Sequence, residues 1–217
     1  MATATVAFAD KGVAGTSLDG LATELGVTKQ TILYHFGSKD GLITAVVTEA
    51  AEELVDALRT AIVHSGPGWA RVESVVRASF ALAVRRPELL GLLREVNRLG
   101  PPWSEVVLEL LQPLVDRAID YLADGMAHGR FQSGDPQMVI VSAYAVVTGV
   151  VADGEVLRAV GLDLDLRVAA RLRRTLLSFL EAVLKVQPVE SATALGDEEQ
   201  DDDIVGGSEE RAGRPAN

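Results

Sequence analysis

The sequence contains no cysteine among its 217 residues, and this absence excludes disulfides, thiolate metal sites and a cysteine nucleophile. Histidine is also scarce: the 3 histidines lie far apart, without the H-x-x-E-H or H-E-x-x-H spacing of zinc sites. A Gly-x-Ser-x-Gly elbow, a phosphate loop and a dinucleotide fingerprint are absent as well. We therefore expect a protein that is not an enzyme and that has no metal site and no cofactor.

Long apolar runs are missing too. The longest uncharged stretch, residues 136–152, includes Gln137, Ser142 and Thr148 and falls short of the roughly 20 apolar residues that a membrane span needs. The N-terminal sequence MATATVAFADKG lacks the basic segment and apolar stretch of a signal peptide. We expect a buried helix at 136–152 and a cytoplasmic protein without a membrane partner.

Basic residues are outnumbered, with 20 Lys and Arg against 31 Asp and Glu, a net charge of −11. This balance excludes a strongly basic coat for nucleic acid. Much of the excess lies in residues 187–217, where nine acids and two bases give −7, so residues 1–186 carry −4. This terminal segment has almost no large apolar residues to offset its ordering entropy. We predict a disordered, solubilising acidic tail at 187–217, with a DNA-mimic role as the alternative.

The rest of the chain shows helical spacing of apolar residues. Hydrophobic residues make up 48% of the sequence, enough for a substantial core, and no run alternates as a strand would. Glycine and proline clusters separate the periodic segments. The periodic segments are 38–63, 69–85, 88–99, 103–128, 136–152 and 166–186. Together with short N-terminal helices, they predict an all-α fold of about nine helices.

Residues 16–39 have the pattern of a helix-turn-helix. Thr16 and Asp19 fit a capping box at the start of a helix. Gly26 can adopt the left-handed conformation that ends it. The stripe between them consists of Leu18, Leu21, Ala22 and Leu25.

A second short helix, Lys29–Phe36, would follow with Thr28 as its cap. A small Ala22 lets the two helices cross closely, and Ile32 fills the angle between them. Phe36 is best interpreted as a core residue that holds this helix in place. The alternative, a purely structural helical corner, is disfavoured by the completeness of the pattern.

The exposed positions of this second helix suit DNA. Its N-terminal end would enter the major groove, where Gln30 can pair with adenine and Lys29 can reach guanine or a phosphate. Amides at the start of the next helix, at Ser38, favour a phosphate. The predicted DNA-binding residues are Thr28, Lys29, Gln30 and Thr31 for bases, Thr16, Tyr34, His35 and Lys39 for phosphates, and Ser17 beside them.

Two strings within residues 7–47 resemble the TetR/AcrR family of transcriptional regulators. They are Phe-Ala-Asp-Lys-Gly-Val-Ala-Gly-Thr-Ser-Leu (8–18) and Gly-Val-Thr-Lys-Gln-Thr-Ile-Leu-Tyr-His-Phe-Gly-Ser-Lys-Asp-Gly-Leu (26–42). The resemblance implies a homodimer that binds a palindromic DNA operator. It also implies a larger C-terminal domain that binds a small-molecule effector and releases DNA, with repression as the family's usual mode.

The sequence departs from the family pattern in two places. Met1 begins inside the first helix, which in the family usually carries basic residues, and Leu33 stands where a tyrosine is common. Residues 16–39 also sum to zero charge, so we expect few phosphate contacts and a modest salt dependence. These departures motivate the alternative function, a helical ligand- or partner-binding dimer with a degenerate DNA-binding head.

The predicted domains are a helix-turn-helix domain at 1–47 and a helical ligand-binding and dimerisation domain at 48–186. Small residues in 136–152 and an apolar 166–186 favour a four-helix bundle between two copies, although both could be central helices of a monomer. A mostly apolar ligand pocket is expected, with ordinary core packing as the alternative for each aromatic. Its candidate residues are Phe80, Asn97, Trp103, Tyr121, Met126 and Tyr144.

Overall fold

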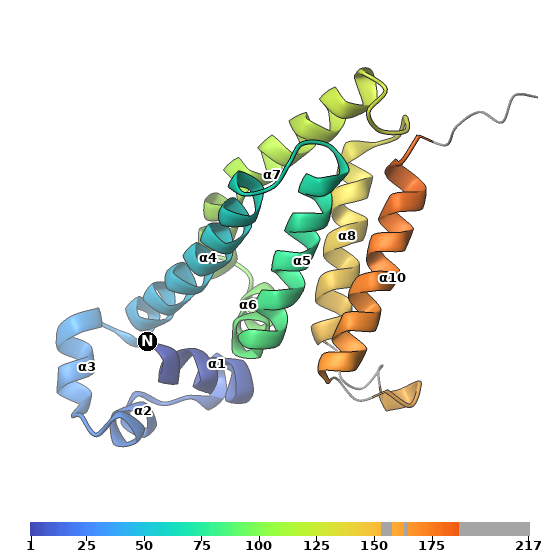
Figure 1. Cartoon of the computed structure of the whole chain (residues 1–217). Helices are drawn as coiled ribbons and strands as arrows, with labels where there is room; N and C mark the ends of the chain where they lie inside the picture. The colour runs from blue at the N-terminus through green and yellow to red at the C-terminus, as the bar shows by residue number, and fades with distance from the viewer. Residues whose placement is uncertain (153–157, 163–164, 187–217) are drawn as a thin grey trace, which may run out of the picture. The chain divides into compact units, whose positions relative to one another are not determined.

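The computed structural model describes residues 1–152, 158–162 and 165–186, with the backbone alone for 148–152. Every regular element in these residues is a helix, so the predicted all-α class is confirmed (Figure 1). The elements are α1 (Ala2–Gly15), α2 (Leu18–Leu25), α3 (Lys29–Phe36), α4 (Lys39–Val63), α5 (Trp69–Arg85), α6 (Pro87–Leu99), α7 (Trp103–Ala127), α8 (Pro136–Ala152) and α10 (Leu166–Leu184). The predicted acidic tail lies outside the described residues.

Helices α1, α2 and α3, which we call the head, fold around one apolar cluster (Figure 1). Phe8 of α1 is fully buried there, and Leu21, Ala22 and Ile32 are almost fully buried. Gly26 ends α2 with φ 66° and ψ 28°, the left-handed geometry that glycine adopts without strain. The predicted corner of Ala22, Gly26 and Ile32 is therefore present, although Leu25 is 45% exposed and lies outside the predicted stripe.

The prediction that Thr16 caps α2 is wrong by one residue. Ser17 is the cap, and its Oγ accepts a hydrogen bond from Gly20 N at 3.0 Å. Thr16 instead turns inward, where its hydroxyl donates to the carbonyls of Ala7 and Gly12. Either hydroxyl type can cap a helix, so the sequence alone could not decide which of two adjacent residues would do so.

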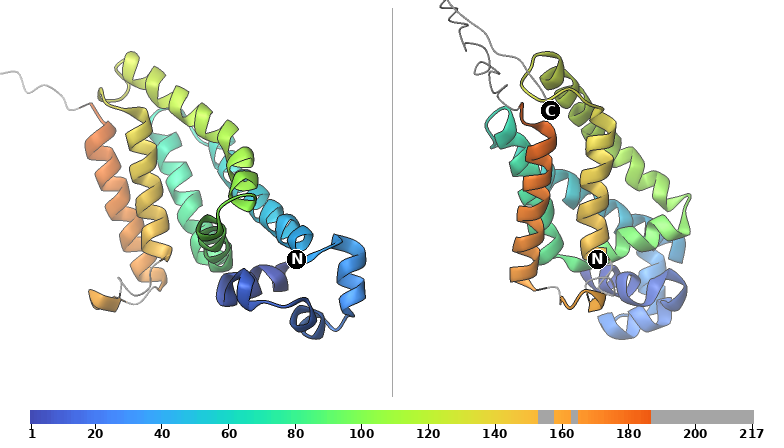
Figure 2. Two further views of the ribbon diagram at one scale, coloured as in Figure 1. Left: turned by 180° about the vertical axis from the view of Figure 1, so that it is seen from behind. Right: turned by 90° about the vertical axis from the view of Figure 1, so that its right-hand side faces the viewer.

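Helix α4 connects the head to the remaining helices. It runs without interruption through the predicted boundary at residue 47, with Ser38 as its cap. Its first half packs into the head's cluster, and α5 and α7 both pack along it (Figures 1 and 2). Helices α8 and α10 lie side by side and cover α5. We call α5, α6, α7, α8 and α10 the helical domain. Its two small apolar clusters centre on Phe80 with Leu176 and on Phe131 with Leu184.

Among the described residues, no helix is long and apolar enough to span a membrane. No group of three or more histidine, aspartate or glutamate side chains in this part of the chain is placed to hold a metal ion.

Candidate nucleic-acid interface

Helix α3 is held by one face and presents the other to solvent. Thr28 caps it, accepting from Thr31 N at 3.1 Å. Ile32 is 5% exposed, and Leu33 and Phe36 pack against the same cluster. The predicted base-reading residues Gln30 and Thr31 are exposed, as are Tyr34 and His35. The helix is therefore an outward-presented element, as the sequence predicted.

Leu33 and Tyr34 divide the inward and outward roles. Leu33 contributes to the head's packing, whereas Tyr34 is 86% exposed. Successive residues of a helix point about 100° apart. The Tyr34 phenol therefore projects from a different side of α3 than a tyrosine at position 33 would, and any phosphate that it contacts must lie on that side.

Lys29 is not a free cation. Its ammonium donates to Asp19 Oδ2 of α2 at 2.8 Å, and the two side chains are 43% and 72% exposed. An exposed pair of this kind contributes little stability. It nevertheless offsets the charge of the cation at the N-terminal end of α3, so Asp19 competes with a phosphate or guanine for the Lys29 ammonium.

Two of the predicted phosphate contacts hold the head together instead. The Thr16 side chain is buried, with its hydroxyl already donating to backbone carbonyls, and this argues against a phosphate contact. Lys39 donates to the Val13 carbonyl at 2.6 Å and is partly buried. An ammonium has three donors, so Lys39 keeps the capacity for a second partner. Ser17 is exposed.

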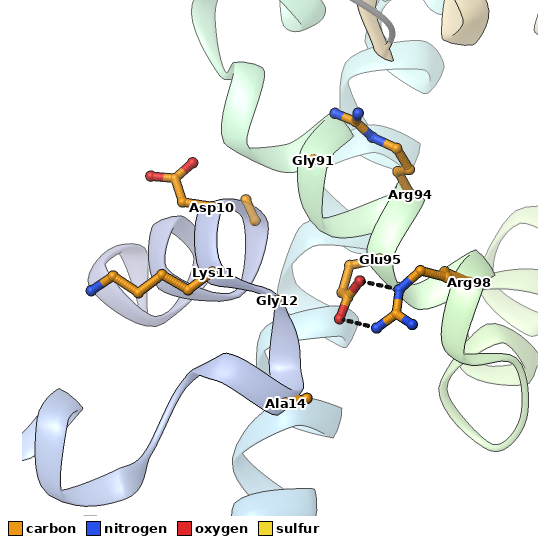
Figure 3. A pocket seen from close by; sticks show the side chains of 9 residues that line it. Asp10, Lys11, Gly12, Ala14, Gly91, Arg94, Glu95 and Arg98 are labelled. Carbon is orange, nitrogen blue, oxygen red and sulfur yellow. Dashed lines mark hydrogen bonds and ion pairs between the residues drawn. The ribbon is translucent and has the colours of Figure 1, made fainter.

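The peptide group of Val13 is gripped from two sides. Its carbonyl accepts from Lys39 of α4, and its N–H donates to Glu95 Oε1 of α6 at 2.9 Å. Glu95 also accepts two hydrogen bonds from Arg98, both 2.8 Å long (Figure 3). Hydrogen bonds from Arg98, and a further one from Val13 N–H, lower the pKa of the Glu95 carboxyl against the opposing effect of burial.

This grip requires glycine at two points of contact between α1 and α6. Gly12 adopts φ 71° inside α1, and an added Cβ would lie 2.9 Å from Glu95 Oε1. A Cβ on Gly91 of α6 would lie 2.9 Å from the Cβ of Ala9. A shallow pocket of about 380 Å³ opens beside them, lined by polar groups that include Asp10, Arg94 and Arg98 (Figure 3).

The structure does not bring the six candidate ligand residues together. Tyr121 and Met126 share the Phe131 cluster, Phe80 is buried in the other small cluster, and Trp103 packs against the head's cluster. Asn97 and Tyr144 approach one another at the surface, at 3.4 Å from Nδ2 to the phenol oxygen. Tyr121 and Met126 remain the best supported as neighbours, while the ligand-binding role of all six stays a prediction.

The predicted dimer helices carry exposed apolar side chains. On α8, Met138, Val141 and Tyr144 are each more than half exposed. On α10, Phe179 is 51% and Val183 40% exposed. Large apolar side chains gathered on two adjacent helices favour contact with a partner surface.

Sequence reasoning missed Glu95, Asp19 as the partner of Lys29, and the structural role of Lys39. Each depends on a tertiary contact between different helices, from 10 positions apart for Asp19 and Lys29 to 82 for Val13 and Glu95. The one local signal was Gly12, because a glycine inside a helical segment suggests a close approach.

Comparisons with known proteins agree with this geometry. Residues 1–46 match the family described as bacterial regulatory proteins, tetR family. The HTH-type transcriptional regulatory protein RaaS of Mycobacterium tuberculosis is 29% identical over 124 residues, which are 57% of this chain and 54% of RaaS. The chain thus matches about half the length of that curated relative.

Solved structures share the fold. The ketosteroid transcriptional regulator KstR2 of Mycobacterium tuberculosis superimposes with a TM-score of 0.69 at 17% identity, over 85% of this chain and 92% of KstR2. The regulator FadR from Bacillus subtilis, in complex with stearoyl-CoA, gives 0.67 at 17% identity, over 82% and 94%. The predicted resemblance to the TetR/AcrR family is confirmed.

Proposed function

We propose that this chain is a ligand-responsive transcriptional repressor that binds a palindromic operator as a homodimer. The match of residues 1–46 to the tetR family and the fold shared with the regulator KstR2 support this proposal. The observation that carries this proposal is the presentation of α3. Its inner residues are fixed in the head's cluster, while Gln30, Thr31 and Tyr34 face solvent. Such a helix can enter a major groove without unfolding any part of the head.

The proposed reading of DNA is divided between bases and phosphates. Gln30 pairs with adenine, Thr28 and Thr31 contact neighbouring base edges, and Lys29 transfers from Asp19 to guanine or a phosphate. Tyr34, His35 and Ser17 hold phosphates, with Lys39 as a further donor. Few cations take part, so the affinity should fall only modestly with salt.

The proposed dimer forms through α8 and α10. Packing the exposed side chains of these helices against their counterparts buries apolar area and generates two-fold symmetry. Two α3 helices would then face one side of a duplex, about 34–36 Å apart or a multiple of that distance. A regulator that acts on DNA in this way works in the cytoplasm.

The proposed effector binds in the helical domain and alters the head through α6 and α4. Both helices hold the Val13 peptide, α6 through Glu95 and α4 through Lys39. A shift of either helix therefore moves α1, and with it the head. The ligand favours release only to the extent that it binds the DNA-free form more tightly.

Selection of bound sequences from random duplex DNA, repeated at low and high salt, tests the proposal. Recovery of a two-fold symmetric motif is the expected result. In anisotropy titrations on that motif, Gln30→Ala should weaken binding by about tenfold. Gln112→Ala, at an exposed position of α7 outside both the head and the proposed dimer helices, is the matched control and should leave the affinity unchanged.

The alternative, a dimer whose head no longer binds DNA, predicts that selection yields no motif. A symmetric motif whose binding is insensitive to Gln30→Ala and Tyr34→Phe would keep the regulator but refute the assigned contacts.

A further inference from the structure

Arg71 differs from three nearby arginines, each of which pairs with a carboxylate. Arg77 pairs with Glu73, Arg86 with Glu53 and Glu88, and Arg98 with Glu95. Arg71 has no carboxylate partner among the described residues, and its Nε is shut off from solvent without a hydrogen-bond acceptor. A guanidinium stays charged and offers five donors. Burying such a donor unpaired is unfavourable, so this position calls for an acceptor that the surrounding side chains do not supply.

The Arg71 guanidinium is held in place by an aromatic ring. Its central carbon lies 4.9 Å from the centre of the Tyr121 ring on α7. The Tyr121 hydroxyl accepts from Gly68 N at 2.5 Å and donates to Gly68 O at 3.2 Å, which fixes the ring. A guanidinium stacked on a ring keeps its in-plane N–H groups free for another partner. The stacking therefore prepares Arg71 for an anion rather than satisfying its donors.

The side chains around Tyr121 are apolar and partly buried. The Phe131 cluster joins α5, α7 and α8 through Val72, Met126 and Ile140, all of which keep part of their surface exposed. Arg173 of α10 also has a buried Nε without a hydrogen-bond partner. Unlike Arg71, however, it contacts no aromatic ring in the described contacts. The combination of a prepared cation and an apolar belt is thus found at Arg71.

We propose that Arg71 binds the acidic head group, a carboxylate or a phosphate, of an effector whose apolar body lies against Val72, Met126 and Ile140. This inference rests on the proposed function, because it names the chemical class of the effector. Bidentate recognition by arginine is well matched to both oxyanions. Apolar contact with the exposed parts of these partly buried side chains would supply the remaining affinity.

The test uses the full chain and Trp69, two positions from Arg71, as a fluorescent reporter. Trp103→Phe removes the other of the 2 tryptophans. The probes are straight-chain carboxylates from hexanoate to tetradecanoate, decyl phosphate and the neutral decanol, all below micelle formation. We expect at least one anion to bind about tenfold more tightly than its alcohol, and Arg71→Met to remove that preference while decanol binding is unchanged.

Controls separate charge from structure. Arg77→Met on the same helix removes an exposed, paired arginine and should leave anion binding intact. Arg71→Lys keeps the charge and should retain part of the preference. If Arg71→Met fails to fold, the wild-type preference for anion over alcohol and the Arg71→Lys titration still decide the matter.

The inference is overturned if decanol competes equally with decanoate and decyl phosphate, if none of the probes binds, or if Arg71→Met keeps the anion preference. Operator binding is measured in parallel on the same preparations. If the protein binds the operator but no anion, this inference is refuted and the proposed regulator function stands. If it binds an anion but no operator, the proposed regulator function is refuted and the acidic ligand at Arg71 stands.

Discussion

The head and the helical domain are packed in different ways. The cluster that holds the head has 18 buried members, eight from α1, α2 and α3 and ten from α4, α6 and α7. The two clusters of the helical domain have 4 and 3 such members in the described residues, each surrounded by partly buried apolar side chains. Protein interiors normally pack as densely as organic crystals. The apolar side chains that hold the head are therefore buried within a single chain. The helical domain, by contrast, keeps exposed apolar surface that a ligand or a second copy can cover.

Helix α4 shows this contrast within one element. In its first half, Ile43, Val46 and Val47 are fully buried. In its second half, Leu54, Leu58 and Ile62 continue the same apolar face but remain partly exposed. One continuous helix thus runs from a fully buried region to a partly exposed one. A displacement of its C-terminal half would therefore also displace its N-terminal half, which packs into the head.

The largest loss of stability should come from a substitution in the well-buried cluster of the head. Phe8→Ala removes a fully buried ring and should lower the free energy of unfolding by about 3–5 kcal/mol. Phe179→Ala removes a ring that is 51% exposed and should cost about 1 kcal/mol or less in the monomer. Urea unfolding at low protein concentration measures both. Equal losses would contradict the difference in packing.

The next effect concerns the joint between α1 and α6. Glu95→Ala leaves the buried Val13 N–H without its acceptor and should cost about 1.5–3 kcal/mol of unfolding free energy. Glu95→Gln keeps an acceptor for Val13 and should recover part of that loss. In operator titrations the alanine variant should bind more weakly than the glutamine variant. Equal behaviour of the two would show that the Val13 contact has no part in fixing the head.

The same joint gives a pH dependence with a definite sign. Hydrogen bonds from Arg98 lower the pKa of Glu95 in the folded state. The stabilisation from this carboxylate is therefore complete above the ordinary glutamate pKa of about 4.3 and is lost as the pH falls through the lowered value. Wild type should lose more stability than Glu95→Gln when urea unfolding is repeated below that ordinary pKa. An equal loss of unfolding free energy in the two proteins would show that Glu95 does not contribute to the acid sensitivity.

The sequence predicted the elements of both regions but not their joints. Helix positions followed from apolar spacing, and α5 and α8 begin and end at the predicted residues. The corner of the helix-turn-helix was predictable because Ala22, Gly26 and Ile32 act over a few residues. Glu95, by contrast, is one exposed-type residue among many on an amphipathic helix, and only the folded chain brings it to Val13.

The candidate site was predictable to the same degree. Outward-facing positions of α3 followed from helical spacing, and Gln30, Thr31 and Tyr34 are exposed as expected. The pairing of Lys29 with Asp19 and the inward turn of Thr16 depend on how α1, α2 and α3 meet, which no local pattern specifies. The ligand residues were hardest, since aromatic side chains in helices look alike whether they line a core or a binding site.

A smaller effect is expected on dimer association, through the exposed apolar side chains of the helical domain. Phe179→Ser removes apolar surface from the exposed face of α10 and should weaken the proposed dimer by about tenfold, with little change in helix content. Sedimentation velocity over a range of concentrations measures the association. Leu108→Ser, at a 60% exposed position on α7, is the control and should leave it unchanged. Identical association of the two variants would place the dimer contact elsewhere.

The smallest effect concerns the ion pair between Lys29 and Asp19 at the DNA-facing end of the head. Asp19→Asn frees Lys29 and should raise operator affinity by about two- to fivefold, the range expected for an exposed pair. Glu24→Gln on the same helix makes the same change of charge at an exposed position that has no ion pair in the described contacts, and it should have a smaller effect. In a Lys29→Met background, Asp19→Asn should lose most of its benefit, because the ammonium that it frees is gone. If Asp19→Asn weakens binding instead, the aspartate positions Lys29 for DNA rather than withholding it, and the neutral reading surface is part of how the operator is recognised.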